Sequence, residues 1–394
     1  MKKSKILTVD DVLAPVTFAR TVLGMAPYHI QNGRLTYHKI RSLICLVTII
    51  TITTITAYFL LNLEVFLNTQ ATIVGTIKAV IIIRRIGSVV ALLVTIGPSR
   101  SNFIKILKIR HDLNQIDERL SKFGCKEEIN QSNYIHRKKI IFLLLLSSMV
   151  LVLGEVVIMK IFISSFETIQ ALVFTYPVVV MKTINTSFHG TTLILQARFN
   201  CINTLFSTSI PLDKNFSKNV QHLTLIHRDL VQTSRRLNRV FNLQLLLWIF
   251  LNSVLLIGDL HAATYVVVFR LSGKLYRVLV ISVKNCLTYS FDFYYLCKRC
   301  KELCYEANRT RILLLGVRLP VNNKEDERDT VITSALNLLN NKLEITACRL
   351  FRVDYTLLFS ICGVAFSYLF IVLQLEVGDV KRSADGSFSN TSVY

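Results

Sequence analysis

The sequence predicts an all-α membrane protein with seven transmembrane helices, and three observations support this fold class. The chain is 52% hydrophobic with a mean hydropathy of +0.47, yet its formal charge is +21, so apolar and charged residues must be segregated. Two stretches, 42–63 and 355–375, contain no charged residue, and each is long enough to cross a hydrocarbon core of about 30 Å as a helix. The third observation is the distribution of Lys and Arg between the predicted spans.

Five weaker spans lie between these two, and ionisable residues interrupt or adjoin each of them. We place them at about 71–98, 140–160, 168–196, 240–258 and 278–297. The segments on the N-terminal side of the membrane hold 35 Lys and Arg, whereas the opposite segments hold 5. Because basic residues concentrate on the cytoplasmic face, we expect a cytoplasmic N-terminus and an extracellular C-terminus.

The predicted organisation follows from these spans. The basic start does not predict a cleaved signal peptide, because Asp10 and Asp11 interrupt the apolar region. Apolar residues recur at helical spacing in the loops 197–239 and 298–354, which indicates membrane helices prolonged into the cytosol or amphipathic helices joined to them. We expect a cytoplasmic N-terminus at 1–41, six membrane helices with a ligand-pocket region and cytoplasmic loops at 42–296, cytoplasmic anchor helices at 297–354, a pore-lining last membrane helix at 355–376, and an extracellular tail at 377–394.

The chain lacks the sequence motifs of common enzymes and cofactor sites. It contains no Gly-rich phosphate loop, nucleophile elbow or zinc-protease motif, so we expect neither an enzyme nor a bound cofactor. Cys297, Cys300 and Cys304 have no histidine near them and are typical of one helix face rather than of a metal site. The basic residues are spread along one membrane side, which indicates anionic lipid as their partner and not nucleic acid.

Ionisable residues within the predicted spans are candidates for function, because each costs at least about 2.5 kcal/mol in lipid. The predicted topology places several of them in the outer halves of the spans, where tyrosine rings accompany them. A cavity open to the outside would suit a small ligand. The alternative is that the charges pair with one another and only hold the bundle together. The ligand-binding candidates are Glu155, Tyr176, Asp259, His261, Tyr265 and Tyr276.

The last predicted helix carries small and polar residues on one side. At 100° per residue, they occupy one arc of about 80°, while most other positions are large and apolar. Close helix packing through Gly363-x-x-x-Ser367 explains such an arc, and so does a wet pore surrounded by this helix from several subunits. The polar arc consists of Thr356, Ser360, Gly363, Ser367, Ile371 and Gln374.

The end of this helix resembles a family signature. Ser367 and Tyr368, five apolar residues, then Gln374 and Leu375 are similar to the C-terminal motif of insect gustatory receptors, Thr-Tyr-(five apolar)-Gln-Phe. The tyrosine and the glutamine match at the family spacing, whereas serine replaces threonine and leucine replaces phenylalanine. Length, span number, predicted orientation and long cytoplasmic loops agree with this family across the chain.

The resemblance implies a ligand-gated, non-selective cation channel in the plasma membrane of chemosensory neurons. It implies a homo- or hetero-tetramer with other gustatory receptors, in which the last helices surround the pore and the cytosolic helices anchor the subunits. The tastant pocket would lie between the outer halves of the second to sixth helices. The implied pore and gate residues are Gln374 and Leu375 at the constriction, Ile371 and Ser367 along the same helix, and Tyr368 in support.

The resemblance also narrows the class of ligand. Sugar-sensing members carry glutamate after the signature tyrosine, where this chain has Leu369, so we expect a receptor for bitter or other non-sugar plant compounds. A fructose-type receptor remains an alternative. An insect odorant receptor shares the predicted architecture but lacks the tyrosine-to-glutamine signature. A secondary transporter would show more spans and related halves, and a G-protein-coupled receptor would have the opposite orientation.

Overall fold

The chain was analysed as a computed structural model. It describes residues 7–23, 25, 28–31, 34–37, 99–162, 168–208, 216–268, 276–316 and 325–389, with isolated helical residues within 43–58 and 86–94. The predicted first and second spans, 42–63 and about 71–98, therefore lie largely outside the described residues.

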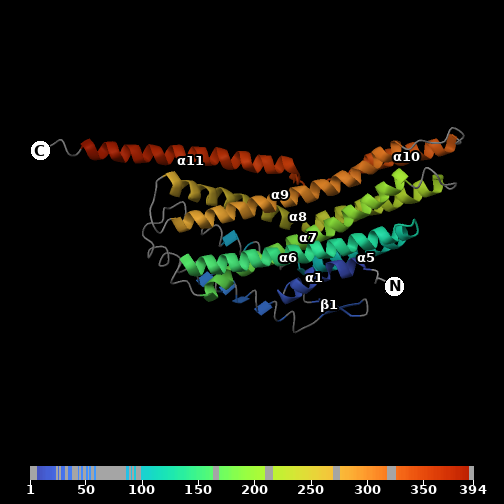
Figure 1. The fold of residues 1–394 in the computed structure, drawn as a ribbon, viewed down its shortest axis with the longest axis horizontal. Helices are drawn as coiled ribbons and strands as arrows, with labels where there is room; N and C mark the ends of the chain where they lie inside the picture. Colours follow the sequence, from blue (N-terminus) through green and yellow to red (C-terminus); the bar gives the residue numbers. More distant parts are fainter. Residues whose placement is uncertain are drawn as a thin grey trace.

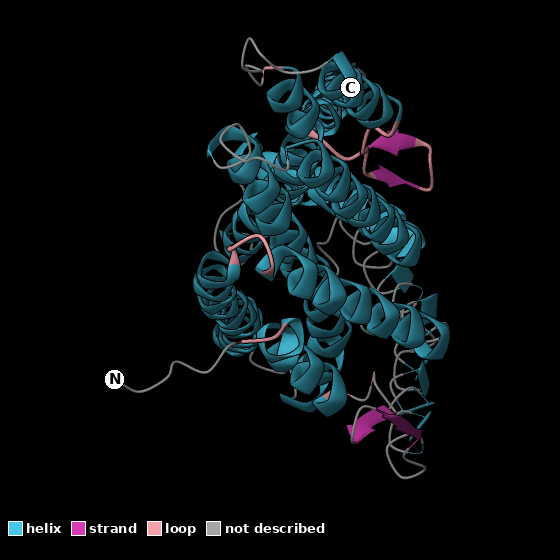
Figure 2. Cartoon of the chain, turned by 90° about the vertical axis from the view of Figure 1, so that its right-hand side faces the viewer, coloured by secondary structure: helices cyan, strands magenta, loops and turns pink. Residues whose placement is uncertain are grey.

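Long helices that run side by side make up the described part of the chain (Figure 1). Two short antiparallel hairpins accompany them and lie at opposite edges of the bundle (Figure 2). The helices are α1 (Val9–Val22), α5 (Ser99–Ser121), α6 (Lys126–Phe162), α7 (Thr168–Thr208), α8 (Phe216–Val268), α9 (Tyr276–Leu315), α10 (Glu325–Asn340) and α11 (Tyr355–Ser389), and the strands are β1 (Tyr28–Gln31), β2 (Arg34–Tyr37), β3 (Thr346–Ala347) and β4 (Phe351–Arg352).

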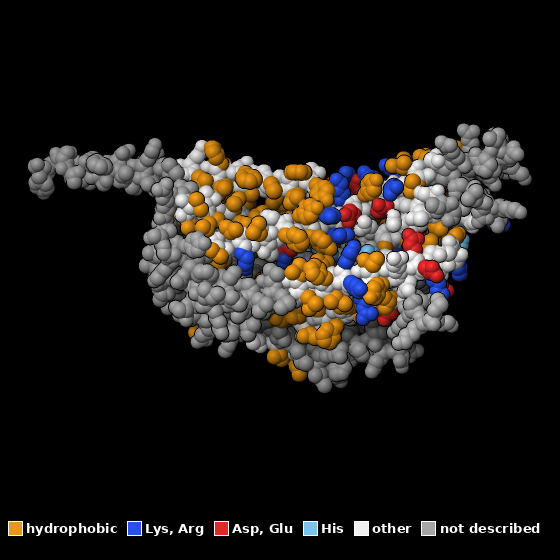
Figure 3. Space-filling model, viewed as in Figure 1, with side chains coloured by type: hydrophobic (Ala, Val, Ile, Leu, Met, Phe, Trp, Pro, Cys, Tyr) orange, Lys and Arg blue, Asp and Glu red, His pale blue; other side chains and the backbone are white. Residues whose placement is uncertain are grey.

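Helices α6 to α9 are too long to lie wholly within a bilayer. α8 contains 53 residues, which corresponds to about 80 Å, more than twice a hydrocarbon core of about 30 Å. Figure 3 shows apolar side chains over the left part of one face and charged side chains toward the right. We call the part formed by the predicted spans the apolar half, and the remainder the charged half. In the loop 197–239 the described helices are continuations of α7 and α8, as the first alternative predicted. In 298–354 a continuation of α9 is followed by the separate helix α10, as the second alternative predicted.

The predicted span boundaries do not coincide with helix ends. Among the described residues, Ser217–Val267 form one helix that is long and apolar enough to cross a membrane, and Tyr355–Ile371 form a shorter apolar stretch. Helix α9 runs through the expected boundary at 297, and α11 continues past 376 to Ser389. Charged residues end a membrane span but not a helix, because the backbone hydrogen bonds continue equally well in water.

Helix α1 packs its apolar face into the bundle. Thr8 caps the helix in a reciprocal capping box with Asp11, which satisfies backbone donors at its start. Val12, Leu13 and Val16 are fully buried, and α1 contacts both α6 and α7. At Gly190 on α7, an added Cβ would lie 2.9 Å from Cδ1 of Ile140 and 3.1 Å from Cδ2 of Leu13, so a larger residue would require these side chains to shift.

The C-terminal end of α1 reaches into the apolar half. The hydroxyl of Tyr176 on α7 donates a 2.7 Å hydrogen bond to the carbonyl of Leu23, at the end of α1. Tyr176 lies within the predicted fourth span, so part of the segment 1–41 lies beside membrane helices. The hydropathy pattern does not reveal this position, because a 14-residue helix is too short to span a bilayer.

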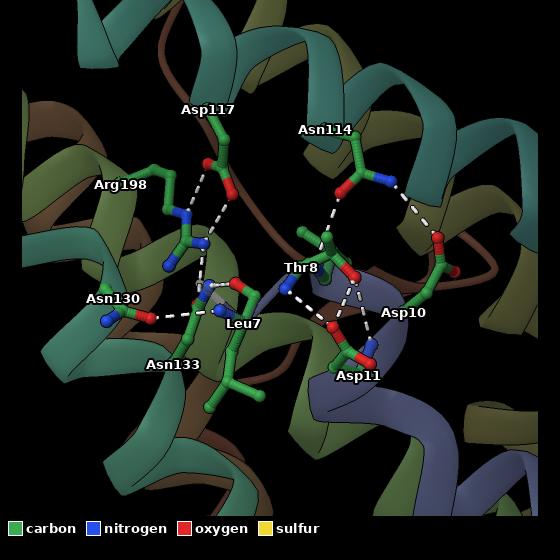
Figure 4. A network of polar contacts seen from close by, with 10 residues as sticks. Leu7, Thr8, Asp10, Asp11, Asn114, Asp117, Asn130, Asn133 and Arg198 are labelled. Atoms are coloured by element: carbon green, nitrogen blue, oxygen red, sulfur yellow. Dashed lines mark hydrogen bonds and ion pairs between the residues drawn. The ribbon is translucent and has the colours of Figure 1, made fainter. Parts of the chain in front are cut away.

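A buried arginine joins four segments in the charged half (Figure 4). Arg198 of α7 is fully buried and donates to both carboxylate oxygens of Asp117 on α5, at 2.8 and 2.7 Å. It also donates to the amide oxygen of Asn133 on α6, at 2.7 Å. Asn133 in turn donates to the carbonyl of Leu7, whose own N–H donates to Asn130. The network therefore fixes α5, α6, α7 and the N-terminal segment relative to one another.

A second buried side chain links α7, α8 and α9. His227 of α8 is 2% exposed, and its Nε2 lies 2.9 Å from the carbonyl oxygen of Ala307 on α9. Its ring meets that of Phe199 on α7 edge-to-face, with centroids 5.2 Å apart. Burial lowers the pKa of His227 to about 4, so the imidazole is neutral at physiological pH and its Nε2–H donates to the carbonyl.

Helix α10 covers α8 and α9 at the charged end. Val331, Ala335 and Leu338 are buried there, while Ile332, Leu336 and Leu339 on another side of the helix are exposed. The chain returns to α11 through β3 and β4, and the side chain of Asn308 on α9 exchanges two 3.0 Å hydrogen bonds with the backbone of Leu343. The expected anchor region thus packs on its own subunit and keeps a second apolar face uncovered within one chain.

Removal of the buried arginine should destabilise the protein. Arg198→Ala leaves Asp117 and Asn133 without their shared donor and should cost about 3–5 kcal/mol. Thermal unfolding of the purified protein in detergent measures this loss. The control is Arg119→Ala, which breaks a half-exposed 2.8 Å pair with Asp229 and should cost less than about 1 kcal/mol. Equal melting shifts for the two variants would contradict the assigned role of Arg198.

Acid should destabilise the protein through His227. Its pKa is about 4 in the folded protein and near 6.5 in the unfolded chain, so only the unfolded chain binds a proton between these values. Stability should therefore fall by up to about 1.4 kcal/mol per pH unit as the pH drops from 6.5 toward 4. Melting temperatures of His227→Gln should depend less on pH over this window. The exposed His222→Gln serves as control and should keep the original slope.

Candidate functional site

Buried polar side chains occur on both α8 and α9 in the apolar half, and we call Asp259, Ser282 and Asn285 the polar cluster. Asp259 and His261 of α8 are 6% and 3% exposed, and Ser282 and Asn285 of α9 are 2% and 4% exposed. The hydroxyl of Ser282 lies 3.5 Å from the Asp259 carboxylate, to which it donates. Buried polar groups of this kind are costly unless paired, so their concentration on two facing helices marks this region for function.

Of the predicted ligand-binding residues, His261 and Tyr265 have neighbouring rings, with centroids 6.3 Å apart on α8. Asp259 lies on the same helix, but two residues before His261, so the two side chains point about 200° apart around it. Tyr176 lies elsewhere, because its hydroxyl bonds to Leu23 at the end of α1. Sequence reasoning missed Ser282 and Asn285, since it searched the spans for charged groups and aromatic rings. Their spacing of three residues on one helix was the available signal.

Three predicted site residues have side chains outside the described part of the structure. Glu155 lies within α6, Tyr276 begins α9, and Leu375 lies within α11, but the placement of their side chains is not described. Their roles in ligand binding and gating stay predictions.

Two other charges in the spans form a structural pair. Lys182 of α7 and Asp292 of α9 form an ion pair, and both side chains are largely buried. Nearby, His189 packs edge-to-face on the ring of Tyr295, with centroids 4.8 Å apart. Lys182 and Asp292 thus pair with each other and join α7 to α9, which is the structural role that the sequence analysis gave as the alternative to ligand binding.

The cysteine cluster of α9 faces the protein interior. Cys297 and Cys300 are fully buried, Cys304 is half-buried, and all three are free thiols. Burial raises the pKa of the Cys300 thiol well above its usual value and that of Cys304 to about 11. Because metal binding needs a thiolate, these protonated side chains act as small apolar groups in the helix contact.

Helix α11 packs on α8 and α9 through one narrow face. Ile361 and Ala365 are buried, and Leu369 and Leu373 are half-buried, at successive intervals of four residues. At 100° per residue and counted from Ser360, this packing face centres at about +160° and the polar arc at about −20°. The two centres are therefore about 180° apart around the helix. The polar arc thus lies opposite the face that packs on the rest of the subunit.

Every member of the polar arc is exposed in the single chain. Ser360, Ser367 and Gln374 are all exposed, and Ile371 is 55% exposed. A Cβ added at Gly363 would meet no heavy atom within 4 Å among the described residues. Tyr368 lies beside the arc and is 46% exposed. The subunit therefore contributes no packing partner to the arc within its described part.

Comparison with known proteins decides the family. The family model of seven-transmembrane chemosensory receptors matches residues 14–377. The chain belongs to this family. A Drosophila melanogaster protein named gustatory receptor 22b is 22% identical over 165 residues, which span 42% of this chain and 42% of that relative. The family confirms the expectation of a chemoreceptor that resembles gustatory receptors, and it is a family of membrane receptors rather than of enzymes.

Solved structures share the fold of this chemosensory receptor. The insect olfactory receptor OR5 from Machilis hrabei is similar with a TM-score of 0.67 at 12% identity, over 92% of this chain and 97% of that chain. The same receptor in complex with eugenol is similar with a TM-score of 0.62 at 13% identity, over 93% and 98% of the two chains. At this identity the likeness concerns the fold, and it confirms the predicted all-α, seven-span architecture.

Proposed function

We propose that this receptor is a taste receptor that acts as a ligand-gated, non-selective cation channel, with α11 from four subunits around a central pore. The observation that carries the proposal is the direction of the polar arc, which points away from the subunit's own packing face. Hydrocarbon does not satisfy the side-chain amide of Gln374, whereas water in a pore does. The hydroxyl of Ser360 donates to the carbonyl of Thr356 at 2.9 Å and so is satisfied within the helix. In the four-fold arrangement, Ile371, Gln374 and Leu375 form the constriction and Tyr368 supports it from the side.

The exposed face of α10 supports assembly of several subunits. Ile332, Leu336 and Leu339 are 42%, 56% and 49% exposed, and they recur at helical spacing in the charged half, where lipid does not cover them. An apolar stripe of this kind suits contact with a neighbouring subunit. The anchor region would then hold the tetramer together while α11 surrounds the pore, whether the neighbours are copies of this chain or other gustatory receptors.

The polar cluster between α8 and α9 is the proposed tastant site. Asp259, Ser282 and Asn285 supply charge and hydrogen-bonding groups within apolar walls, which is the composition of small-molecule pockets. Leu369, which stands where sugar receptors of the resembled family carry glutamate, favours bitter or other non-sugar plant compounds. The complex of a fold relative with eugenol is consistent with a small organic ligand.

The proposed orientation places the charged half in the cytosol and the C-terminal end of the α11 span at the outer surface of a chemosensory neuron. An odorant receptor channel is the second candidate, because the fold is shared with an insect olfactory receptor. A calcium-flux screen of bitter plant compounds, sugars and volatile odorants on expressing cells separates the two candidates.

The pore role of α11 predicts a pattern of chemical accessibility. In a Cys362→Ala background, Ser367→Cys and Gln374→Cys should react with a charged methanethiosulfonate reagent applied from outside, and agonist-evoked or basal current should fall by about half or more. Phe366→Cys and Phe370→Cys, which are exposed on the flank of the same helix, are the controls and should not change the current. Modification of the flank positions but not of the arc, at equal surface expression, would rule out the assigned pore face.

The tastant site predicts a shift in agonist potency. For an agonist found in the calcium-flux screen, Asp259→Asn should raise the half-maximal concentration by about tenfold or more, because a charged hydrogen bond contributes roughly 1.5–3 kcal/mol. The exposed Asp329→Asn on α10 is the control and should leave the potency unchanged. An unchanged potency for Asp259→Asn at equal surface expression would place the site elsewhere.

A further inference from the structure

A polar cavity lies between α6, α7 and α9, away from the proposed tastant site and pore. Its volume is about 590 Å³, within the range of about 300–1,000 Å³ typical of ligand pockets. Lys139 and His136 line it from α6, Gln196 from α7, and Lys298 and Arg299 from α9. No predicted site residue belongs to it.

The cavity lies at the boundary between the apolar and the charged half. Lys139 immediately precedes the predicted third span, Gln196 ends the fourth, and Lys298 immediately follows the sixth. In the apolar half, close to this boundary, the side chains of Phe142 on α6 and of Leu287 and Phe291 on α9 are exposed. A molecule in the cavity is therefore next to surfaces suited to acyl chains.

The side of the cavity next to the apolar half is basic. Within the described residues, neither Lys139 nor Lys298 forms an ion pair, and the ammonium of Lys298 lies 5.7 Å from the ring centre of Tyr294. Arg299 lies over the ring of Tyr295 and donates to Glu302 at 3.0 Å. Two lysines without a salt-bridge partner among the described residues thus line a space between three helices.

The imidazole beside these cations is kept neutral. Burial, together with the positive charges of Arg198, Lys139 and Arg299, lowers the pKa of His136 to about 4. The largest cause of this low pKa is burial, and the three cations add to it. The neutral ring adds no charge of its own to the cavity.

The carboxylates of the cavity lie farther from the apolar half. Glu306 is seven residues beyond Arg299 on α9, or about 10 Å along the helix, and accepts a 2.9 Å hydrogen bond from Asn203. Glu302 is paired with Arg299, and Glu128 lies eleven residues before Lys139 on α6. Glu128 and Glu306 therefore lie at the end of the cavity away from the membrane, whereas Glu302 lies beside Arg299 on the basic side.

We propose that this cavity binds the phosphorylated headgroup of an inositol phosphate, with Lys139, Lys298 and Arg299 as the phosphate-binding side chains. A phosphoinositide in the adjacent leaflet would place its phosphates on the basic side and its acyl chains on the exposed apolar faces of α6 and α9. Basic pockets between membrane helices on the cytoplasmic side bind such headgroups. The cytoplasmic location of the pocket rests on the orientation given with the proposed function.

A binding assay on the full chain tests the proposal without measuring channel current. Purified receptor in phosphatidylcholine nanodiscs is titrated with fluorescent short-chain phosphatidylinositol 4,5-bisphosphate, and the bound fraction is followed by anisotropy. The double variant Lys139→Gln with Lys298→Gln should bind the probe about tenfold more weakly or worse. Inositol 1,4,5-trisphosphate, added as a soluble competitor, shows whether a free phosphate compound suffices or whether the lipid is required.

The control carries the same change in charge on the same helices. Lys138→Gln with Lys301→Gln removes two exposed lysines that do not line the cavity and should leave the affinity within about twofold of the native value. If the cavity double variant fails to fold, the single variant Lys139→Gln, at an exposed position, should still weaken binding about threefold. Equal weakening by the two double variants, or no saturable binding to the native receptor, overturns the proposal. A current measurement that rejects the channel would leave this binding result unaffected.

Discussion

The arrangement of the charged half depends on the buried guanidinium of Arg198. A fully buried cation is tolerated only when hydrogen bonds and an opposite charge surround it. The side-chain oxygens of Asp117 on α5 and Asn133 on α6 must therefore lie within about 3 Å of the guanidinium. This requirement fixes the register of three helices and, through Asn133, the path of the N-terminal segment. The wall of the basic cavity formed by α6 and α7 follows from the same register.

Helices α8 and α9 connect the functional regions of the receptor. The polar cluster of Asp259 and Ser282 lies in their apolar half, the Asp292 ion pair and the basic cavity lie farther along α9, and α10 packs on both helices at the charged end. Helix α11 also packs on this pair. A ligand at the proposed tastant site that shifted α8 against α9 would therefore act on the support of α11, because α11 packs directly on both helices. Each helix is continuous across the membrane boundary, which allows a displacement at one end to reach the other.

Two exposed surfaces of the subunit bear on the proposed assembly. On α11 the polar arc is exposed opposite the packing face, and on α10 an apolar stripe is exposed in the charged half. The polar side chains of the arc are stabilised by contact with water, whereas the apolar side chains of the stripe are stabilised by burial against another apolar surface. In the proposed four-fold assembly, the arcs would line a water-filled pore and the stripe of each subunit would contact a neighbour.

The sequence by itself determined the features that depend on local pattern: the span count, the helical periodicity of the long loops and the polar arc of α11. Hydrocarbon requires about 20 uncharged helical residues, and a helix repeats every 3.6 residues, so neighbouring positions suffice. The tertiary structure alone decided the pairing of Arg198 with Asp117, the bond of Tyr176 to Leu23, and the meeting of Asp259 with Ser282. These contacts join segments far apart in the chain and depend on the rotation and register of packed helices, which no local pattern specifies. The sequence shows that the polar residues share one arc of α11, but only the structure shows that this arc lies opposite the face that contacts α8 and α9.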